Sequence, residues 1–251
     1  MKKLYQKSPE KTLEKVTPLR YSFFTMTQIP NIMKKLEGTS VYDTILSIEG
    51  SYARIQKEQT EWYKTSSFTC PEGCGSCCHS FEPDLFEGEA LYMAAWLLEN
   101  QEERAKKIAE GQYPFRHEDG ICPLYNPHTP YHCSIYGGRP FICRLFGASG
   151  FRSRTGQKVW RPCKFYPEEL LERHNPPLQK KQYSESETIE FLGAVPPLMS
   201  DMTEKARSSS IGETRLLHEI LPETIRRLLW LISMNDNGND NPNGTPSPKA
   251  A

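Results

Sequence analysis

Four of the eight cysteines in this chain lie within nine residues, in the sequence CPEGCGSCC. The two glycines allow a tight loop, and thiolates two or three residues apart on such a loop can converge on one soft cation. A regular strand or helix would point the same thiols in different directions. The window therefore predicts metal ligands at Cys70, Cys74, Cys77 and Cys78.

Cys77 and Cys78 are adjacent in the chain. Because neighbouring side chains usually point apart, we expect the two sulfurs to serve different metals, or different irons of one cluster. The pair therefore favours a multinuclear iron centre slightly over a single zinc ion.

The other four cysteines are spread over the next part of the chain, at Cys122, Cys133, Cys143 and Cys163. Eight thiolates are twice the four that a tetrahedral zinc ion or a [4Fe-4S] cluster needs, so two centres or one centre with spare cysteines are allowed. Pro140 is expected at the first position of a short helix, where the positive helix end would stabilise the Cys143 thiolate. The alternative is that Cys143 is a small buried apolar residue.

Two histidines adjoin cysteines and are alternative ligands. His79 follows Cys78, and His132 precedes Cys133. Either imidazole can replace a thiolate at a zinc site.

The stretch from residue 115 to 164 is rich in cations and poor in acids. Its basic residues are Arg116, Arg139, Arg144, Arg152, Arg154, Lys158, Arg161 and Lys164, and its acids are Glu118 and Asp119. Such cations would offset the charge of about −2 on a four-thiolate centre. They alternate with aromatic residues and cysteines, and the whole chain has zero net charge, which argues against a nucleic-acid partner.

Apolar periodicity predicts helices on both sides of the cysteines. Val41, Ile45, Ile48, Tyr52, Ile55 and Trp62 recur at three- and four-residue steps, so we expect a helix from Thr39 with Ser40 as its N-cap. Further helices are expected at Glu87–Glu99, with Leu91, Ala95 and Leu98 on one face, at Glu102–Ala109, and at Glu213–Ile232 with an interruption or kink near Pro222. Short strands and turns are expected from Phe115 to Tyr166. The predicted fold is α+β and mainly helical, with helices around an irregular, cysteine-rich core.

Four segments are expected along the chain. Residues 1–38 form a basic arm that is partly disordered, and residues 39–170 form the metal-binding domain. Residues 171–234 form a C-terminal helical segment that packs on the core. Residues 235–251 contain no large apolar side chain and are expected to be disordered.

The sequence gives two indications of where the protein works. It contains no apolar run near the ~20 residues that a membrane span needs. Its first residues, MKKLYQKSPEKTLEK, contain no apolar core of a signal peptide, so a cytoplasmic location is expected. In a reducing compartment, cysteine clusters serve metal binding or redox chemistry more often than disulfides.

The combination of CPEGCGSCC with ICPLY, HCSIYGGRPFICRLFG and the later Cys163 resembles the YkgJ-like cysteine-cluster family. The resemblance covers the chain from Cys70 to Cys163. It implies a zinc- or iron-chelating domain with an iron-sulfur or zinc centre, and no assigned reaction. The cysteine box is also similar to that of the flagellin lysine N-methylases.

We therefore expect a metal-binding protein that holds an iron-sulfur cluster, of the [4Fe-4S] type, or zinc. Its ligands are Cys70, Cys74, Cys77, Cys78, Cys122, Cys133, Cys143 and Cys163. One alternative is a cluster-dependent enzyme, acting in redox chemistry or in lysine methylation of a protein, which a pocket with Arg139, Tyr136 and Arg144 beside the metal would favour. Another alternative is a zinc-stabilised interaction module. The expected partner is a protein or a small molecule, and not a membrane.

Overall fold

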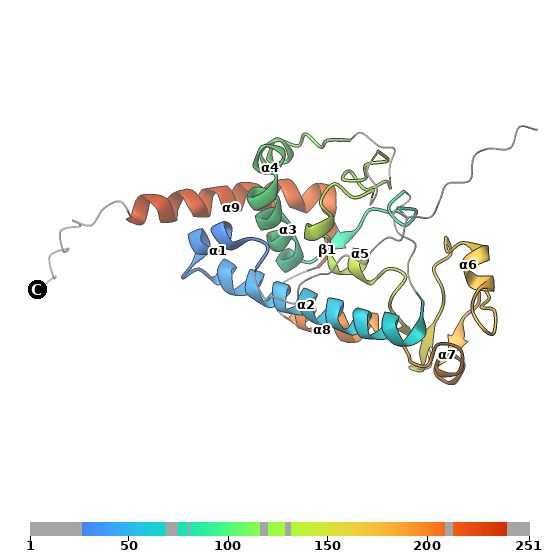
Figure 1. Ribbon diagram of the computed structural model, residues 1–251. Coiled ribbons are helices and arrows are strands. Elements are labelled where there is room, and N and C mark those ends of the chain that lie inside the picture. Colours follow the sequence, from blue (N-terminus) through green and yellow to red (C-terminus); the bar gives the residue numbers. More distant parts are fainter. Residues whose placement is uncertain are drawn as a thin grey trace, which may run out of the picture.

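The computed structural model describes residues 27–68, 75–79, 81–115, 120–128, 132–208 and 213–239. Its helices are α1 (Pro30–Leu36), α2 (Ser40–Ser66), α3 (Glu87–Asn100), α4 (Glu102–Ala109), the 3-10 helix η1 (Tyr136–Gly138), α5 (Phe141–Leu145), α6 (Glu168–Glu172), α7 (Glu185–Leu192), α8 (Met199–Ser208) and α9 (Leu217–Asn239). Its strands are β1 (Asp84–Leu85), β2 (Phe151–Arg152), β3 (Lys158–Trp160), β4 (Tyr183–Ser184) and β5 (Arg215–Leu216). The predicted α+β, mainly helical class is confirmed (Figure 1).

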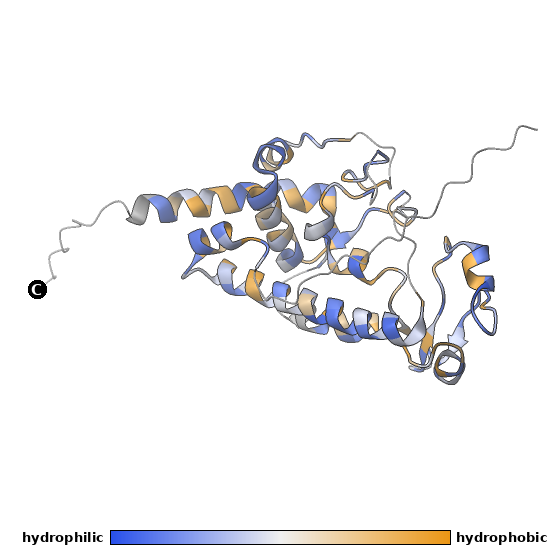
Figure 2. Cartoon of the chain, viewed as in Figure 1, coloured by the Kyte–Doolittle hydropathy of each residue, from blue (hydrophilic) through white to orange (hydrophobic). Residues whose placement is uncertain are grey.

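Helix α2 is the longest element and runs along both halves of the fold (Figure 1). Its buried apolar residues are those that define the predicted amphipathic face, Val41, Ile45, Ile48, Tyr52, Ile55 and Trp62. Hydrophilic and hydrophobic residues alternate along it in Figure 2. The N-cap is Thr39, one residue before the expected Ser40, because the Thr39 hydroxyl accepts a hydrogen bond from the backbone N–H of Tyr42 at 3.2 Å.

Helix α3 lies at the centre of the larger hydrophobic core. Its bounds match the predicted Glu87–Glu99 to within one residue, and α4 has the predicted bounds Glu102–Ala109. The sequence predicted one apolar face on α3, whereas burial extends to Ala90, Met93 and Ala94 on its other sides. The reason is that α1, α2, α4 and α9 all pack around α3.

Helix α9 begins later and ends later than the predicted Glu213–Ile232. It starts at Leu217 because Arg215 and Leu216 form β5, and it continues to Asn239. The helix passes through Pro222 without the interruption that the sequence suggested. Residues 235–239 of the expected disordered tail are therefore helical.

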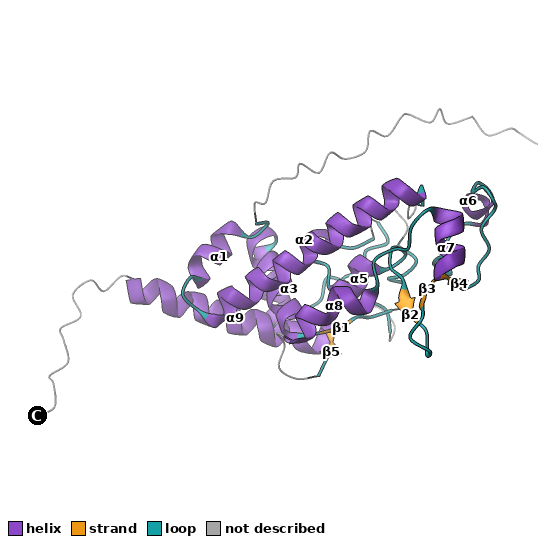
Figure 3. Ribbon diagram, turned by 90° about the horizontal axis from the view of Figure 1, so that it is seen from below, coloured by secondary structure: helices purple, strands orange, loops and turns teal. Residues whose placement is uncertain are grey.

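Two small antiparallel sheets join distant parts of the chain. Strand β1 pairs with β5, with Asp84 opposite Leu216 and Leu85 opposite Arg215, and so connects the cysteine region to the start of α9. Strands β2, β3 and β4 form the second sheet, which lies near α7 at one end of the fold, whereas β1 and β5 lie nearer its middle (Figure 3). Strands were expected between residues 115 and 166, where β2 and β3 occur. Strands β1, β4 and β5 lie outside that stretch.

A second hydrophobic core lies at the C-terminal end of α2. Its largest buried side chains are Trp62, Phe68, Trp160 and Tyr183. The Phe68 ring stands edge-on to that of Trp160, with ring centroids 5.1 Å apart. This core packs α7 and the three-stranded sheet against α2.

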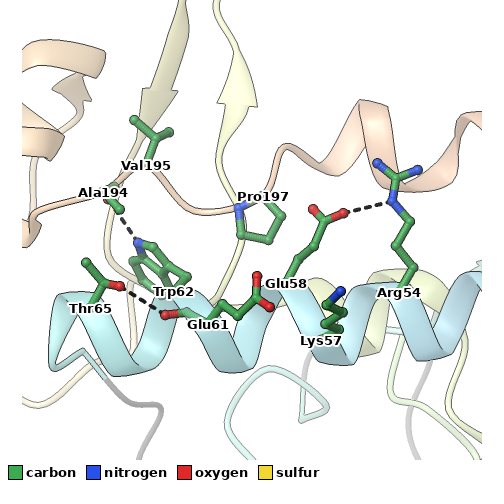
Figure 4. Close-up of a pocket in the computed structure, with 9 residues that line it drawn as sticks. All are labelled: Arg54, Lys57, Glu58, Glu61, Trp62, Thr65, Ala194, Val195 and Pro197. Atoms are coloured by element: carbon green, nitrogen blue, oxygen red, sulfur yellow. Dashed lines mark hydrogen bonds and ion pairs between the residues drawn. The ribbon is translucent and has the colours of Figure 1, made fainter.

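Trp62, in the second core, is hydrogen-bonded to the loop that follows α7, as Figure 4 shows. Its indole N–H donates a hydrogen bond of 3.0 Å to the carbonyl oxygen of Ala194. Gly193, just before Ala194, ends α7 with a φ of 74°, a conformation that favours glycine. The bond thus holds the left-handed end of α7 against α2.

Replacing Trp62 with phenylalanine should lower the free energy of unfolding by about 2 kcal/mol, since it removes this hydrogen bond and part of a buried ring. Urea denaturation measures the change. The matched control is Trp230→Phe on α9, where the side chain is 59% exposed and the change should stay within about 0.5 kcal/mol. Equal effects in the two variants would contradict the role given to Trp62.

The ends of the chain are described only in part. Residues 1–26 of the expected basic arm lie outside the described residues, and α1 forms within the rest of that segment, with Ile32, Met33 and Leu36 buried. Residues 240–251 also lie outside the described residues. In the described part of the chain, none of the helices is both long enough and apolar enough to cross a membrane.

Candidate metal centre

Five cysteines from three separate segments line one small cavity, called here the thiol cavity. They are Cys77, Cys78, Cys122, Cys133 and Cys143, called the cavity cysteines. The cavity has a volume of about 20 Å³, and its lining includes Cys143 on α5 and Pro83 just before β1. A space of this size admits a single water molecule or ion.

The first two cavity cysteines lie on a tight turn. The backbone N–H of Cys78 donates to the carbonyl oxygen of Gly75 at 2.9 Å. A Cβ added at Gly75 would lie 2.3 Å from the Cβ of His132, so only glycine allows the turn to approach this closely. Both sulfurs face the same cavity, 4.0 Å apart. The expectation that Cys77 and Cys78 point apart is therefore wrong, because it assumed an extended backbone.

The next two cavity cysteines lie on a short hairpin-like loop. Tyr125 pairs with Cys133 in an antiparallel bridge, and its backbone N–H donates to the carbonyl oxygen of Cys122 at 2.9 Å. Ser134 closes the loop through a backbone bond of 3.1 Å to Leu124. Both cysteines pack against the larger hydrophobic core.

The fifth cavity cysteine, Cys143, is the third residue of α5. Pro140 is the N-cap of this helix and not its first residue, one position earlier than predicted. The helix brings Cys143 to the two other segments, and no disulfide joins two of the six described cysteines.

Apolar side chains form most of the remaining lining of the thiol cavity. The described ones are Phe81, Pro83, Met93, Leu124, Ile135, Pro140, Phe146 and Leu217. The rings of Phe81 and Phe146 meet edge-to-face, with centroids 5.3 Å apart. Met93 comes from α3 and Leu217 from α9, so the larger core forms part of the wall. A charged thiolate in such surroundings is costly unless a cation accompanies it.

Burial decides the protonation of the thiols. Desolvation raises the pKa of Cys122 to about 12 and raises the pKa values of Cys133 and Cys143. The bond between the adjacent sulfurs lowers the pKa of Cys77 to about 7 and raises that of Cys78. The expectation that the helix start stabilises the Cys143 thiolate is thus wrong for the metal-free site, because burial outweighs the helix end. A metal ion must displace protons here.

Arg139 is the charged side chain among the described residues that line the cavity. Its guanidinium lies 3.5 Å over the ring of Tyr136, and its Nε donates to the Tyr136 carbonyl oxygen at 3.1 Å. Against the larger effect of burial, Arg139 lowers the pKa values of Cys133 and Cys143. It therefore supplies part of the positive charge that a thiolate-rich centre needs.

Arg144 lies outside the cavity lining and binds the backbone of the segment that carries Arg139. Its Nε donates to the carbonyl oxygen of Arg139 at 2.7 Å, and a terminal nitrogen donates to that of Gly137. Its guanidinium lies 3.9 Å over the ring of Tyr52 on α2. Arg144 thus ties η1 to α5 and does not line the thiol cavity.

Glu89 is a buried residue of the site that the sequence did not single out. It is 2% exposed, and its carboxylate accepts hydrogen bonds from the backbone N–H groups of Phe141, at 2.6 Å, and Phe86, at 2.9 Å. It therefore caps both α3 and the helix that carries Cys143. Desolvation raises its pKa to about 7. An acid inside the apolar run EGEALYMAAWLL was the available signal.

The remaining predicted ligands lie elsewhere or outside the described residues. Cys70 and Cys74 are outside them. Cys163 faces a second pocket that adjoins the thiol cavity, and it packs on the smaller core. Neither His79 nor His132 is among the residues lining the cavity: the first meets Tyr125 edge-on, and Nδ1 of the second lies 3.3 Å from the Asn126 carbonyl oxygen.

Most of the other predicted cations lie away from the cavity. Arg152 pairs with Asp201 at 3.3 Å, and Lys158 pairs with Glu185 at 2.9 Å. Arg116 lies outside the described residues. Arg161 and Lys164 line the second pocket.

The described side chains alone do not complete a coordination sphere. Within the part of the chain that the structure describes, no three His, Cys, Asp or Glu side chains are grouped so as to hold a metal ion. The donor set nevertheless fits a soft metal, because five cysteines line one small, largely apolar cavity beside one guanidinium.

Comparison with known proteins identifies one family. Residues 69–185 match the family model described as "Putative zinc- or iron-chelating domain", named CxxCxxCC. The match includes all eight cysteines and confirms the resemblance to the YkgJ-like cysteine-cluster family. In this chain three residues separate the first two cysteines of the box, where the family's name has two. No significant match was found among curated proteins or among solved structures.

Proposed function

We propose, on the premise that residues 69–185 carry a zinc- or iron-chelating domain, that the five cavity cysteines supply thiolates to a buried metal centre. The observation that carries this proposal is that five cysteines from three segments line one small cavity. We further propose that Cys70 and Cys74, from the same loop as Cys77, complete the ligand set together with Cys163.

The surroundings of the thiols support metal binding over a purely apolar role. A protonated thiol that only fills space carries no charge for a cation to balance. Arg139 nevertheless lines the cavity, where a hydrogen bond to the Tyr136 carbonyl oxygen and contact with the Tyr136 ring hold its guanidinium. The loop at Gly75 and the hairpin-like loop at Tyr125 have little regular structure, and a metal would fasten them to α5.

The number of thiols bears on which metal is bound. A tetrahedral zinc ion takes four ligands, whereas five thiols face the cavity and the chain has eight. We therefore favour an iron-sulfur cluster, for which the walls of the 20 Å³ cavity must move apart. Such a cluster supplies one-electron transfer, whereas zinc supplies a structural link between the loop, the hairpin-like loop and α5.

The test is metal and acid-labile sulfide analysis, with an absorption spectrum, on protein purified without oxygen. We expect iron with matching sulfide in the wild type and loss of both in Cys143→Ser and Cys122→Ser. The matched control is Met93→Leu, which changes the cavity wall and removes no thiol, and should retain the metal.

Circular dichroism of each variant separates loss of a ligand from loss of the fold. Zinc without sulfide would replace the cluster by a structural zinc site. Folded wild-type protein with neither iron nor zinc, or Cys variants that keep their full metal content, would overturn the proposal.

A further inference from the structure

A second pocket lies directly beside the thiol cavity, and apart from Cys77 and Cys163 its lining residues have no part in the proposed metal site. It has a volume of about 510 Å³ and lies between the residues after α5 and those after β3. Its size falls in the range of pockets that hold small organic molecules. Cys77, Phe81 and Phe146 line both the pocket and the thiol cavity, so they form the wall between the two.

The charged residues around this pocket are all of one sign. Among its described lining residues, Arg161, Lys164 and Lys180 are basic and none is acidic. Lys180 pairs with Glu168 at 3.0 Å, outside the lining, so its charge is partly offset. The guanidinium of Arg161 lies 5.6 Å from the Phe151 ring centroid, and Nζ of Lys164 lies 4.6 Å from that of Phe165. The two cations are thus held beside aromatic rings at the pocket.

Aromatic side chains form the rest of the recognition surface. Phe81, Phe146, Phe151 and Phe165 all line the pocket. Phe165 is 38% exposed, so part of its ring is accessible to a ligand in the pocket. Cations next to aromatic walls suit a molecule that has both an acidic group and a flat apolar body.

We propose that this pocket binds a small organic anion with an aromatic body, against the wall that contains Cys77. Arg161 and Lys164 hold the acidic group, and the phenylalanine rings hold the body. The position of this ligand next to a metal rests on the proposed function, whereas its binding to the pocket does not. A centre with such a pocket at its wall meets small molecules and is more than a structural link.

The probe for the test is 8-anilinonaphthalene-1-sulfonate, whose aromatic body carries one sulfonate. Its neutral counterpart, N-phenyl-1-naphthylamine, has the same body without the charge. Fluorescence titration of the full chain gives a dissociation constant for each. The double variant Arg161→Gln/Lys164→Gln should weaken binding of the sulfonate about tenfold, given a few-fold for each cation at about 5 Å in water. Binding of the neutral dye should change less than twofold.

The matched control is Arg154→Gln, which removes the same charge from the turn between β2 and β3, outside the pocket lining. Its affinity for the sulfonate should equal that of the wild type. Raising the salt concentration from 0.05 to 0.5 M should weaken binding of the sulfonate and leave the affinity for the neutral dye unchanged. Equal losses for the two dyes, or no loss in the double variant, would overturn the proposal.

Metal content separates this inference from the function on which it builds. If the protein retains its metal but the wild type and the double variant bind the sulfonate equally well, the proposed anion site is refuted and the metal centre is not. Protein without metal whose sulfonate binding depends on the two cations refutes the metal centre alone. Circular dichroism confirms that each variant is folded, because dyes of this kind also bind loosened cores.

Discussion

Metal affinity is expected to rise about ten-thousandfold for each pH unit between pH 6 and pH 8. Burial places the pKa of Cys122 at about 12 and raises those of Cys133 and Cys143, and the neighbouring Cys77 sulfur together with burial raises that of Cys78, so these four thiols carry protons across this range in the metal-free protein. Each thiol that becomes a ligand releases its proton, and each proton released contributes a factor of about ten per pH unit. Competition between the protein and a chelator for Zn²⁺, measured at several pH values, gives the slope.

The sign follows from the direction of the pKa shifts. A raised thiol pKa favours the protonated, metal-free form at low pH, so acid releases the metal and alkali tightens binding. Cys77, with its pKa lowered to about 7, loses its proton within the range and adds to the slope only on the acid side. The Cys143→Ser variant should show a slope smaller by about one proton. A wild-type slope of one proton or fewer is incompatible with Cys78, Cys122, Cys133 and Cys143 as ligands.

Replacing Glu89 with alanine should lower the free energy of unfolding by about 3–5 kcal/mol. The side chain accepts hydrogen bonds from the backbone N–H groups of Phe86, the N-cap of α3, and Phe141, the first residue of α5; the first donor is partly buried and the second buried, and each would lose its partner at about 1–3 kcal/mol. Urea denaturation measures the loss. The matched control is Glu87→Ala in the same helix, whose half-exposed carboxylate pairs with Arg227 and should contribute no more than about 1 kcal/mol.

Glu89 also gives stability a pH dependence that Glu89→Gln should abolish. Its folded pKa of about 7 exceeds the usual 4.5, so the folded state binds the proton more tightly. The stabilisation that comes from this tighter proton binding is fully present below pH 4.5 and is lost as the pH rises through 7. A shift of this size corresponds to about 3 kcal/mol. The difference in unfolding free energy between wild type and Glu89→Gln should therefore fall over this range. A constant difference would show that Glu89 titrates normally.

The helices near the cysteines were predictable because their signals are local. Apolar steps of three and four residues gave α2, and the bounds of α3 and α4 follow from where that period begins and ends. The start of α9 was not predictable in this way. Arg215 and Leu216 fit a helical pattern, but pairing with residues 84 and 85 draws them into a strand. That pairing joins segments far apart in the sequence.

The candidate site was predictable in its residue types and less so in its arrangement. The cysteine spacing indicates a metal, yet it does not reveal that Cys77 and Cys78 face one cavity or that Cys163 faces the neighbouring pocket. The shared cavity of Cys77 and Cys78 depends on a turn in which Gly75 lies close to His132. The position of Cys163 depends on the packing of the smaller core. Both are contacts between distant segments, which spacing along one chain does not encode.

The β1–β5 pairing places a residue that is synthesised late, Leu217, at the thiol cavity. Leu217, at the first residue of α9, forms one wall of the thiol cavity, and the ribosome synthesises it after every cysteine of the chain. Because folding during synthesis proceeds from the N-terminal side, the cysteines emerge before that wall exists. If the proposed metal reaches the nascent chain, it meets a site that lacks this part of its wall, and we expect later docking of α9 to slow its dissociation.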